Sequence, residues 1–224
     1  MVILTFIATG VGCFFVLERQ LVVKKVECGE GFAGVCLAVE EAFLGRKIYQ
    51  LNTAELSERL MQVNPEIKTA GIKKKLNGTV RLELEKRAPL GVLVSQDNYY
   101  LFDEEGVVFK EVTGPSSYTP VYLEETPDIF IGTNILPPSA LSAVAILKTA
   151  LEEKVAFAQI KDLGSFLSAQ LDNGVLVWFP LESGLTGRDY ANMLADLKKI
   201  LVQASLEKRD ISKIDFRYSK IVVE

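Results

Sequence analysis

The first segment of the chain is far more apolar than anything that follows it. Met1 to Leu17 reads MVILTFIATGVGCFFVL, and no charged side chain occurs before Glu18. An unbroken helix of this length would span about 26 Å, which lies within the range tolerated for crossing the ~30 Å hydrocarbon core of a bilayer. We therefore expect residues 1–18 to form a transmembrane helix.

Two other interpretations of this segment stay open. A cleaved signal peptide would need a basic region before the apolar run and small residues at a cleavage site, and neither is clear in the sequence. The stretch from Gly10 to Cys13 is loosely similar to a lipoprotein cleavage box. However, the apolar run continues beyond Cys13 to Leu17, and a cut before Cys13 would discard the helix-forming part of the segment.

The charges beside the apolar run bear on its orientation. Arg19, Lys24 and Lys25 follow the run, and no Lys or Arg precedes it. The positive-inside rule by itself would therefore keep the C-terminal part of the chain in the cytoplasm. That orientation depends on Met1 being the true start, because a basic tail before it would reverse the balance. A run that begins at full hydrophobicity is typical of a truncated sequence.

Composition excludes several classes of protein. The 224-residue chain contains no His, which removes Ser/His/Asp and Cys/His nucleophiles and imidazole metal ligands. Its 25 Lys and Arg stand against 29 Asp and Glu, giving a net charge of -4, whereas broad nucleic-acid binding needs a concentrated basic excess. The composition therefore favours a binding protein. We expect no enzymatic activity, and no metal, cofactor, nucleic acid or small-molecule substrate.

The residues after the apolar run predict a small α+β module. Its expected elements are, in order, a strand over 21–28, helices over 35–44 and 54–61, and strands over 67–76 and 79–86. Asn52 or Thr53 is expected to cap the second helix. The two last strands meet at Asn77 and Gly78, which is a strong hairpin signal. This order indicates two helices covering one face of a three-stranded sheet.

From Leu90 onward the sequence predicts short strands and two helices. The expected strands cover 99–102, 107–110, 120–123, 129–131, 165–171, 175–179 and 213–223, and the helices cover 137–153 and 188–207. In the longer helix, apolar side chains recur at three- and four-residue steps, as in an amphipathic helix. The change of pattern near Pro89 marks the expected boundary between two domains.

The loop after the first strand carries two motifs with possible chemistry. Gly29, Gly31 and Gly34 satisfy GxGxxG, but the preceding strand is charged and a second helix intervenes before the next strand, so we interpret the motif as a turn. Cys28 and Cys36 flank the same loop. Without His or a CxxC pair, zinc binding lacks ligands. A disulfide is expected if the module lies outside the cytoplasm, and two buried thiols are the alternative.

The last predicted strand, residues 213–223, stands at the very end of the chain. Such a strand frequently lies at a sheet edge, where free N–H and C=O groups can accept a strand from a partner. Arg217 and Tyr218 are residue types that anchor interfaces. The alternative is a strand that only closes its own sheet.

The order of these segments resembles the FtsQ/DivIB family of bacterial cell-division proteins. The resemblance covers essentially the whole chain after residue 20 and is carried by VNPEIKTAGIKKKLNGTVRLELEKRAPLGVL, YYLFDEEGVVF and KIDFRYSKIVV. The family's POTRA-domain pattern is matched at Pro65, Ile67, Lys68, Ala70, Asn77, Glu85, Arg87 and Pro89. Its DxxGVVF motif is matched at Asp103, Gly106, Val107, Val108 and Phe109, and its closing DxRY motif at Asp215, Arg217 and Tyr218.

The resemblance implies an α+β fold class with three parts: a transmembrane helix (1–18), a βααββ POTRA domain (19–89) and a strand-rich mixed α/β domain ending in an edge strand (90–224). It implies a single-pass, N-in membrane protein whose two domains are extracytoplasmic, acting as a non-catalytic scaffold at the division septum. The expected partners are an FtsB/DivIC-like protein, which would dock by β-augmentation at the last strand, and an FtsL-like protein. Arg217 and Tyr218 would set the register, and Ser219, Lys220 and Ile221 would supply main-chain hydrogen bonds.

The sequence departs from the family pattern in two respects, and two other classes of protein are alternatives. The cytoplasmic tail typical of the family is absent from the sequence, and the Cys28/Cys36 pair is not a general family feature. A POTRA-bearing outer-membrane assembly or secretion protein would continue into a long β-barrel, which the residues after Pro89 do not predict. A membrane-anchored extracytoplasmic enzyme would need a catalytic acid, and no residue is singled out as one.

Overall fold

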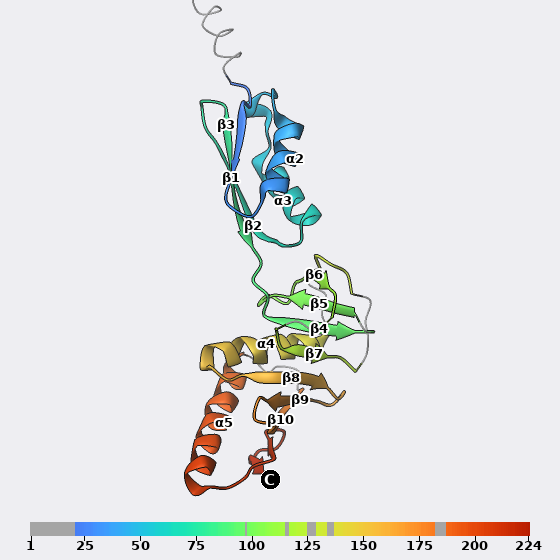
Figure 1. Cartoon of the computed structure of the whole chain (residues 1–224), viewed down its shortest axis with the longest axis vertical. Helices are drawn as coiled ribbons and strands as arrows, with labels where there is room; N and C mark the ends of the chain where they lie inside the picture. The colour runs from blue at the N-terminus through green and yellow to red at the C-terminus, as the bar shows by residue number, and fades with distance from the viewer. Residues whose placement is uncertain (1–20, 97, 115–116, 125–128, 134–136, 182–186) are drawn as a thin grey trace, which may run out of the picture. The chain divides into compact units, whose positions relative to one another are not determined.

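The computed structural model describes residues 21–96, 98–114, 117–124, 129–133, 137–181 and 187–224. The chain divides into two compact units between Arg87 and Ala88. This division lies close to the boundary expected near Pro89. Each unit contains its own sheet (Figure 1). Each also has its own hydrophobic core.

The first unit has the expected order of strand, helix, helix, strand, strand. Its elements are β1 (Lys25–Cys28), α2 (Ala33–Phe43), the 3-10 helix η1 (Ile48–Gln50), α3 (Thr53–Val63), β2 (Ile67–Lys74) and β3 (Thr79–Lys86). The sheet order is β1-β3-β2, with β1 parallel to the central strand and β2 antiparallel to it. Both helices lie on one side of this sheet (Figure 1), as predicted.

Local sequence explains where these elements begin and turn. Asn52 caps α3, because its side chain accepts a hydrogen bond from the Glu55 backbone N–H at 3.4 Å. The β2–β3 hairpin turns at Asn77 and Gly78, and the Asn77 side chain accepts from the Thr79 N–H at 3.1 Å. Gly78 has φ +89°, and a Cβ there would lie 2.5 Å from the carbonyl oxygen of Val22. Only glycine fits this position without displacing the backbone.

The core of the first unit lies between the helices and the inner face of the sheet. Buried side chains alternate along β3 with exposed charged ones, as a strand covered on one face requires. The buried set comprises Val23, Val26, Val39, Ile48, Leu51, Leu60, Val80 and Leu82. A disulfide between Cys28 and Cys36, the pair flanking the glycine loop, joins the end of β1 to the first turns of α2. Within that loop Gly31 takes φ +86°, consistent with a turn.

The second unit is a nine-stranded mixed sheet with two helices. Its elements are β4 (Gly91–Ser95), β5 (Asn98–Phe102), β6 (Val108–Val112), β7 (Pro120–Tyr122), α4 (Pro138–Glu153), β8 (Phe157–Asp162), β9 (Phe166–Leu171), β10 (Leu176–Pro180), α5 (Gly187–Glu207), β11 (Lys213–Asp215) and β12 (Val222–Val223). The sheet order is β12-β11-β10-β9-β8-β7-β4-β5-β6. The last strand in the chain therefore lies at one edge of the sheet.

The main core of the second unit is formed by α4, α5 and the face of the sheet that they cover. It includes Ile146 from α4, Leu194 and Leu197 from α5, and Val177 and Phe179 from β10, each fully buried. A smaller buried cluster, around Val92, Leu101 and Phe109, lies elsewhere on β4, β5 and β6. The neighbouring residues Leu93, Phe102 and Val108 belong to the main core. Because successive side chains of a strand point to opposite faces, the two clusters lie on opposite faces of the sheet.

The expected N-terminal transmembrane helix is not supported. In the part of the chain that the structure describes, no helix is long and apolar enough to cross a membrane. The longest described helix, α5, is amphipathic and packs against α4 instead. The span expected over residues 1–18 lies outside the described residues. The fold class is therefore corrected to a mixed α/β chain with a three-stranded and a nine-stranded sheet.

Further expectations about the second unit need correction. Residues 129–131 are not a strand. Two strands, β4 and β8, were not expected, and β4 was missed because its apolar run GVLVS does not alternate. Four of its five residues are buried, since β4 lies inside the sheet between β7 and β5. A last correction concerns the chain end and bears on the candidate site.

Candidate partner-binding edge at the C-terminus

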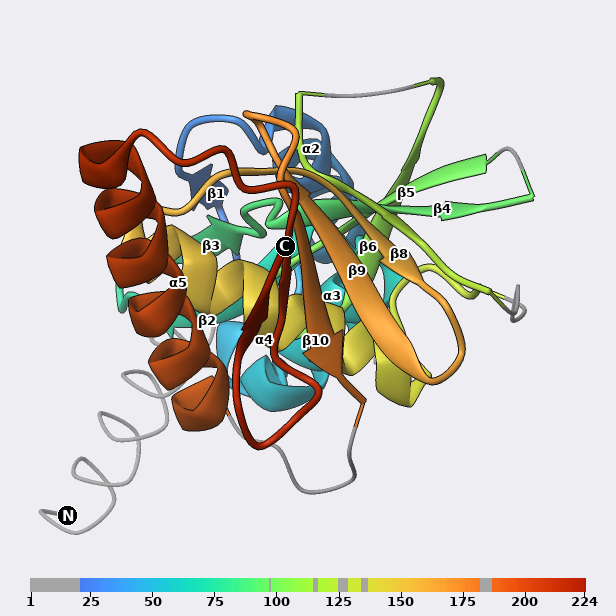
Figure 2. The same cartoon turned by 90° about the horizontal axis from the view of Figure 1, so that it is seen from below.

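The chain end folds into a short hairpin rather than the single strand expected over residues 213–223. β11 pairs in parallel with β10, and the chain then turns so that β12 pairs antiparallel with β11. Ile214 lies opposite Val223, and Asp215 lies opposite Val222. Figure 2 shows the dark red chain end running back beside β10. The prediction of one continuous terminal strand is therefore wrong.

The turn begins where Phe216 enters the core. Its ring stacks on Phe179, with centroids 5.8 Å apart and ring planes 9° from parallel. Its backbone N–H donates to the Trp178 carbonyl at 2.9 Å. Phe216 is 6% exposed, so the chain at this point is held by a buried aromatic side chain. β11 ends at Asp215, and the chain bends away from the strand direction from Arg217 onward.

Hydrogen bonds between Asp215 and Arg217 hold the start of the turn. The Asp215 carboxylate accepts hydrogen bonds from the Arg217 backbone N–H at 3.0 Å and from its Nη2 at 2.7 Å, and Arg217 Nε donates to both carboxylate oxygens. Asp215 is nearly fully buried, and such a charge needs this kind of bidentate partner. Sequence reasoning expected Arg217 to set the register of a partner strand. In the structure, the Arg217 guanidinium instead binds the Asp215 carboxylate.

Aromatic side chains on the outer face of β9 and β10 complete the environment of Arg217. Its guanidinium carbon lies 4.3 Å from the ring centroids of both Phe166 and Trp178. Lys213 Nζ lies 4.5 Å from the Trp178 centroid. Cations in these positions are attracted to the ring faces. We call Phe166, Trp178, Lys213, Asp215 and Arg217 the C-terminal latch, because together they hold the hairpin against the sheet.

The latch predicts a pH dependence. Hydrogen bonds from Arg217 lower the pKa of the Asp215 carboxyl, outweighing the opposing effect of burial. A carboxyl whose folded pKa lies below its unfolded value stabilises the fold fully above about pH 4, and this stabilisation is lost as pH falls through the folded pKa. We expect the hairpin to loosen below about pH 4. Trp178, the only Trp in the chain, should report this by fluorescence, and Asp215→Asn should remove the transition.

The other predicted docking residues lie on the turn and are exposed. Tyr218 is 60% exposed and Ile221 39% exposed, while Ser219 and Lys220 are also open to solvent. None of the four belongs to a strand. These residues therefore lie on the turn between β11 and β12 and not on the strand that was expected.

Main-chain groups suited to accepting a strand belong to β12 instead. Lys213 and Glu224 exchange two backbone hydrogen bonds, at 3.0 and 3.2 Å. Because bonded and non-bonded pairs alternate in an antiparallel ladder, the N–H and C=O of Val223 face away from β11. Val223 therefore presents its backbone at the open edge of the sheet, beside the exposed side chain of Val222. Sequence reasoning did not single out Val222 or Val223, although both lay inside the predicted strand.

Over the residues that the structure describes, no group of three or more His, Cys, Asp or Glu side chains is placed to hold a metal ion. No family model matches the chain, and no curated protein matches it in sequence.

Proposed function

We propose that the chain is a non-catalytic scaffold protein, similar to the FtsQ/DivIB division proteins, that binds an extended segment of a partner at its C-terminal sheet edge. The partner would be an FtsB/DivIC-like protein, itself associated with an FtsL-like protein at the division septum. The observation that carries this proposal is the position of β12, the last strand of the chain, at the open edge of a nine-stranded sheet.

The chemistry of this edge supports strand addition. The backbone of Val223 faces outward, and the apolar side chains of Tyr218, Ile221 and Val222 are exposed around it. Main-chain hydrogen bonds would give affinity, and apolar contacts on alternate side chains would give specificity. A strand of only two residues is a short edge, which limits promiscuous pairing in the absence of the partner.

Two features of the first unit are consistent with the same proposal. Its βααββ order and sheet order match what the resemblance to a POTRA domain implies. Its disulfide between Cys28 and Cys36 is the kind of cross-link that persists in an oxidising compartment, which supports an extracytoplasmic site of action.

The direct test blocks the outward N–H of β12. Val223→Pro removes that donor without removing a ladder bond to β11, because the Val223 N–H faces away from β11. We expect affinity for the extracytoplasmic segment of an FtsB/DivIC-like protein to fall at least about tenfold, the equivalent of about 1.4 kcal/mol for a lost hydrogen bond. Fluorescence anisotropy with a labelled partner segment measures it.

The matched control is Val223→Thr, which keeps the backbone N–H and nearly the same side-chain shape. Its affinity should stay close to that of the unaltered protein, and Trp178 fluorescence should show the hairpin intact in both variants. Tyr218→Ala is expected to weaken binding through lost apolar contact alone. Equal binding by the Pro and Thr variants, with both hairpins intact, would contradict the proposed edge.

A further inference from the structure

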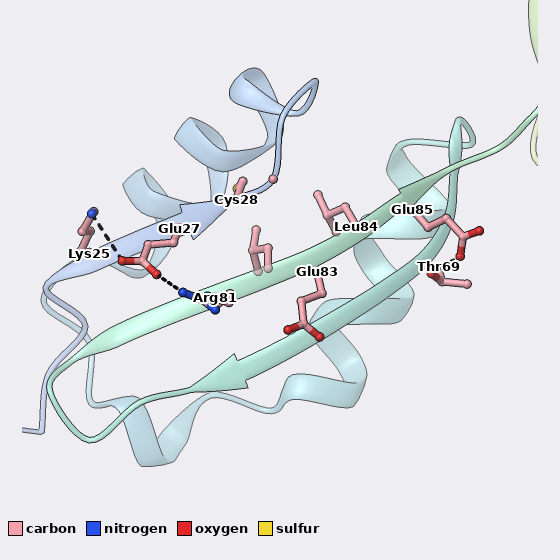
Figure 3. Close-up of a pocket in the computed structure, with 10 residues that line it drawn as sticks. Lys25, Glu27, Cys28, Thr69, Arg81, Glu83, Leu84 and Glu85 are labelled. Atoms are coloured by element: carbon pink, nitrogen blue, oxygen red, sulfur yellow. Dashed lines mark hydrogen bonds and ion pairs between the residues drawn. The ribbon is translucent and has the colours of Figure 1, made fainter.

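The three-stranded sheet of the first unit has a notch on the β1 side of its central strand. β1 ends at Cys28, which pairs with Leu82, while β3 continues to Lys86. Beyond Leu82 no strand of the first unit, whose residues from 21 on are all described, pairs with β3 on this side. A hollow of about 730 Å³ lies there, lined by residues of all three strands (Figure 3).

The backbone of Leu84 faces this notch. The Lys75 N–H donates to the Thr79 carbonyl at 2.9 Å, which fixes the alternation of the β2–β3 ladder. Leu84 lies opposite Ala70, and by this alternation the two residues form a non-hydrogen-bonded pair. The N–H and C=O of Leu84 therefore point away from β2. The β1 ladder stops at Leu82. The main-chain groups of Leu84 are thus directed at an empty strand position.

The charged side chains on the open face beside the notch differ between its two ends. At the end nearest β1, Lys25, Lys75 and Arg81 all converge on Glu27, at 3.4, 3.2 and 3.2 Å, and lower its pKa. At the opposite end, Glu85 forms a hydrogen bond to Thr69 at 3.1 Å and has no ion pair within the described unit. The exposed Glu83 forms an ion pair with the exposed Lys73, with Nζ and Oε1 2.8 Å apart.

We propose that this notch, defined by Cys28, Leu82, Glu83, Leu84 and Glu85, binds an extended basic segment of a protein partner. The segment would take the empty strand position beyond β1 and exchange main-chain hydrogen bonds with Leu84. Its Lys or Arg side chains, at alternate positions, would lie beside Glu83 and Glu85 on the open face. Opposite charges on neighbouring strands stabilise such pairing, whereas an acidic segment would face two like charges.

The disulfide shapes this site. Cys28 is the last residue of β1 and is tied to Cys36 in α2, so the chain turns away from β3 at that point. In Figure 3 the ribbon leaves β1 near Cys28 and rises toward the helix, while Leu84 and Glu85 continue along β3. The notch therefore begins at the residue that carries the covalent link.

The test uses the full chain and a short blocked peptide in which Lys alternates with Val. Amide hydrogen exchange is read at single residues. We expect the Leu84 amide to exchange freely in the unliganded protein and to slow at least about tenfold with saturating peptide, because it gains a main-chain hydrogen bond. The Leu82 amide, already paired with β1, serves as the internal control and should not change.

Charge variants complete the experiment. Glu83→Lys with Glu85→Lys should weaken the Lys peptide roughly tenfold or more and favour a peptide in which Glu alternates with Val. Glu58→Gln, an exposed change on α3, is the matched control and should bind unchanged. Val223→Pro should also bind this peptide normally, which separates the notch from the C-terminal edge. Binding without protection of Leu84, binding insensitive to the charge reversal, or no binding would each overturn the proposal.

Discussion

Replacing Phe216 by Ala is expected to lower the free energy of unfolding of the second unit by about 3–5 kcal/mol, as for other buried Phe side chains. The ring is 6% exposed and stacks on Phe179, so its removal leaves a cavity beside Phe179 in the main core. The same change should release the C-terminal latch, because Arg217 is positioned by the residue before it. Partner binding at β12 is therefore expected to be lost together with stability.

Urea unfolding followed by Trp178 fluorescence measures the stability, and anisotropy with the labelled partner segment measures the binding. Phe109→Ala is the matched control, since Phe109 is 3% exposed and lies in the smaller cluster around β6. It should cost a similar amount of stability and leave the partner affinity of the folded fraction unchanged. If both variants bind alike, the hairpin is not what presents the docking edge.

Removing the disulfide of the first unit is expected to have the second largest effect. Cys28→Ser with Cys36→Ser frees a loop whose ends are separated by 8 residues, and chain entropy assigns such a closure about 2–3 kcal/mol. The first unit is small, so this is a large share of the stability available to a domain of its size. Urea unfolding followed by hydrogen exchange at the β3 amides measures the change.

Reductant supplies the control for this prediction. It should destabilise the first unit of the unaltered protein by about the same amount and leave the double Ser variant unaffected. The amides of β9 and β10, in the second unit, should show no change under any of these conditions, because each unit has its own core. An unaltered protein that is indifferent to reductant would contradict a stabilising role for the link.

Patterns with a local physical cause could be read directly from the sequence. The Asn77–Gly78 turn was predictable because an Asn-Gly pair strongly favours a tight hairpin turn with positive φ. Gly78 does adopt a φ of +89°. The cap at Asn52 and the alternation along β3 were predictable for the same reason. Long helices such as α5 follow from periodicity over several turns.

Features that depend on distant partners were missed or misassigned. Alternation over residues 213–223 indicates one strand, but the chain turns after Phe216 and residues 222–223 pair back onto β11. The Asp215–Arg217 pair holds the start of this turn. Phe166 and Trp178, which hold Arg217, are separated from it by many residues and carry no local signal. The run at β4 was not recognised because burial on both faces removes the alternation on which the prediction relies.

The sequence by itself determined the order of elements in the first unit, the hairpin turn, the boundary between units and the segment that reaches the sheet edge. These depend on backbone preferences and on periodicity within a few residues. Tertiary structure alone decided that Arg217 binds Asp215, that Val223 presents the outward backbone, and that β3 runs past the end of β1. Each of these depends on which strands become neighbours, and strand pairing is set by contacts between residues far apart in the chain.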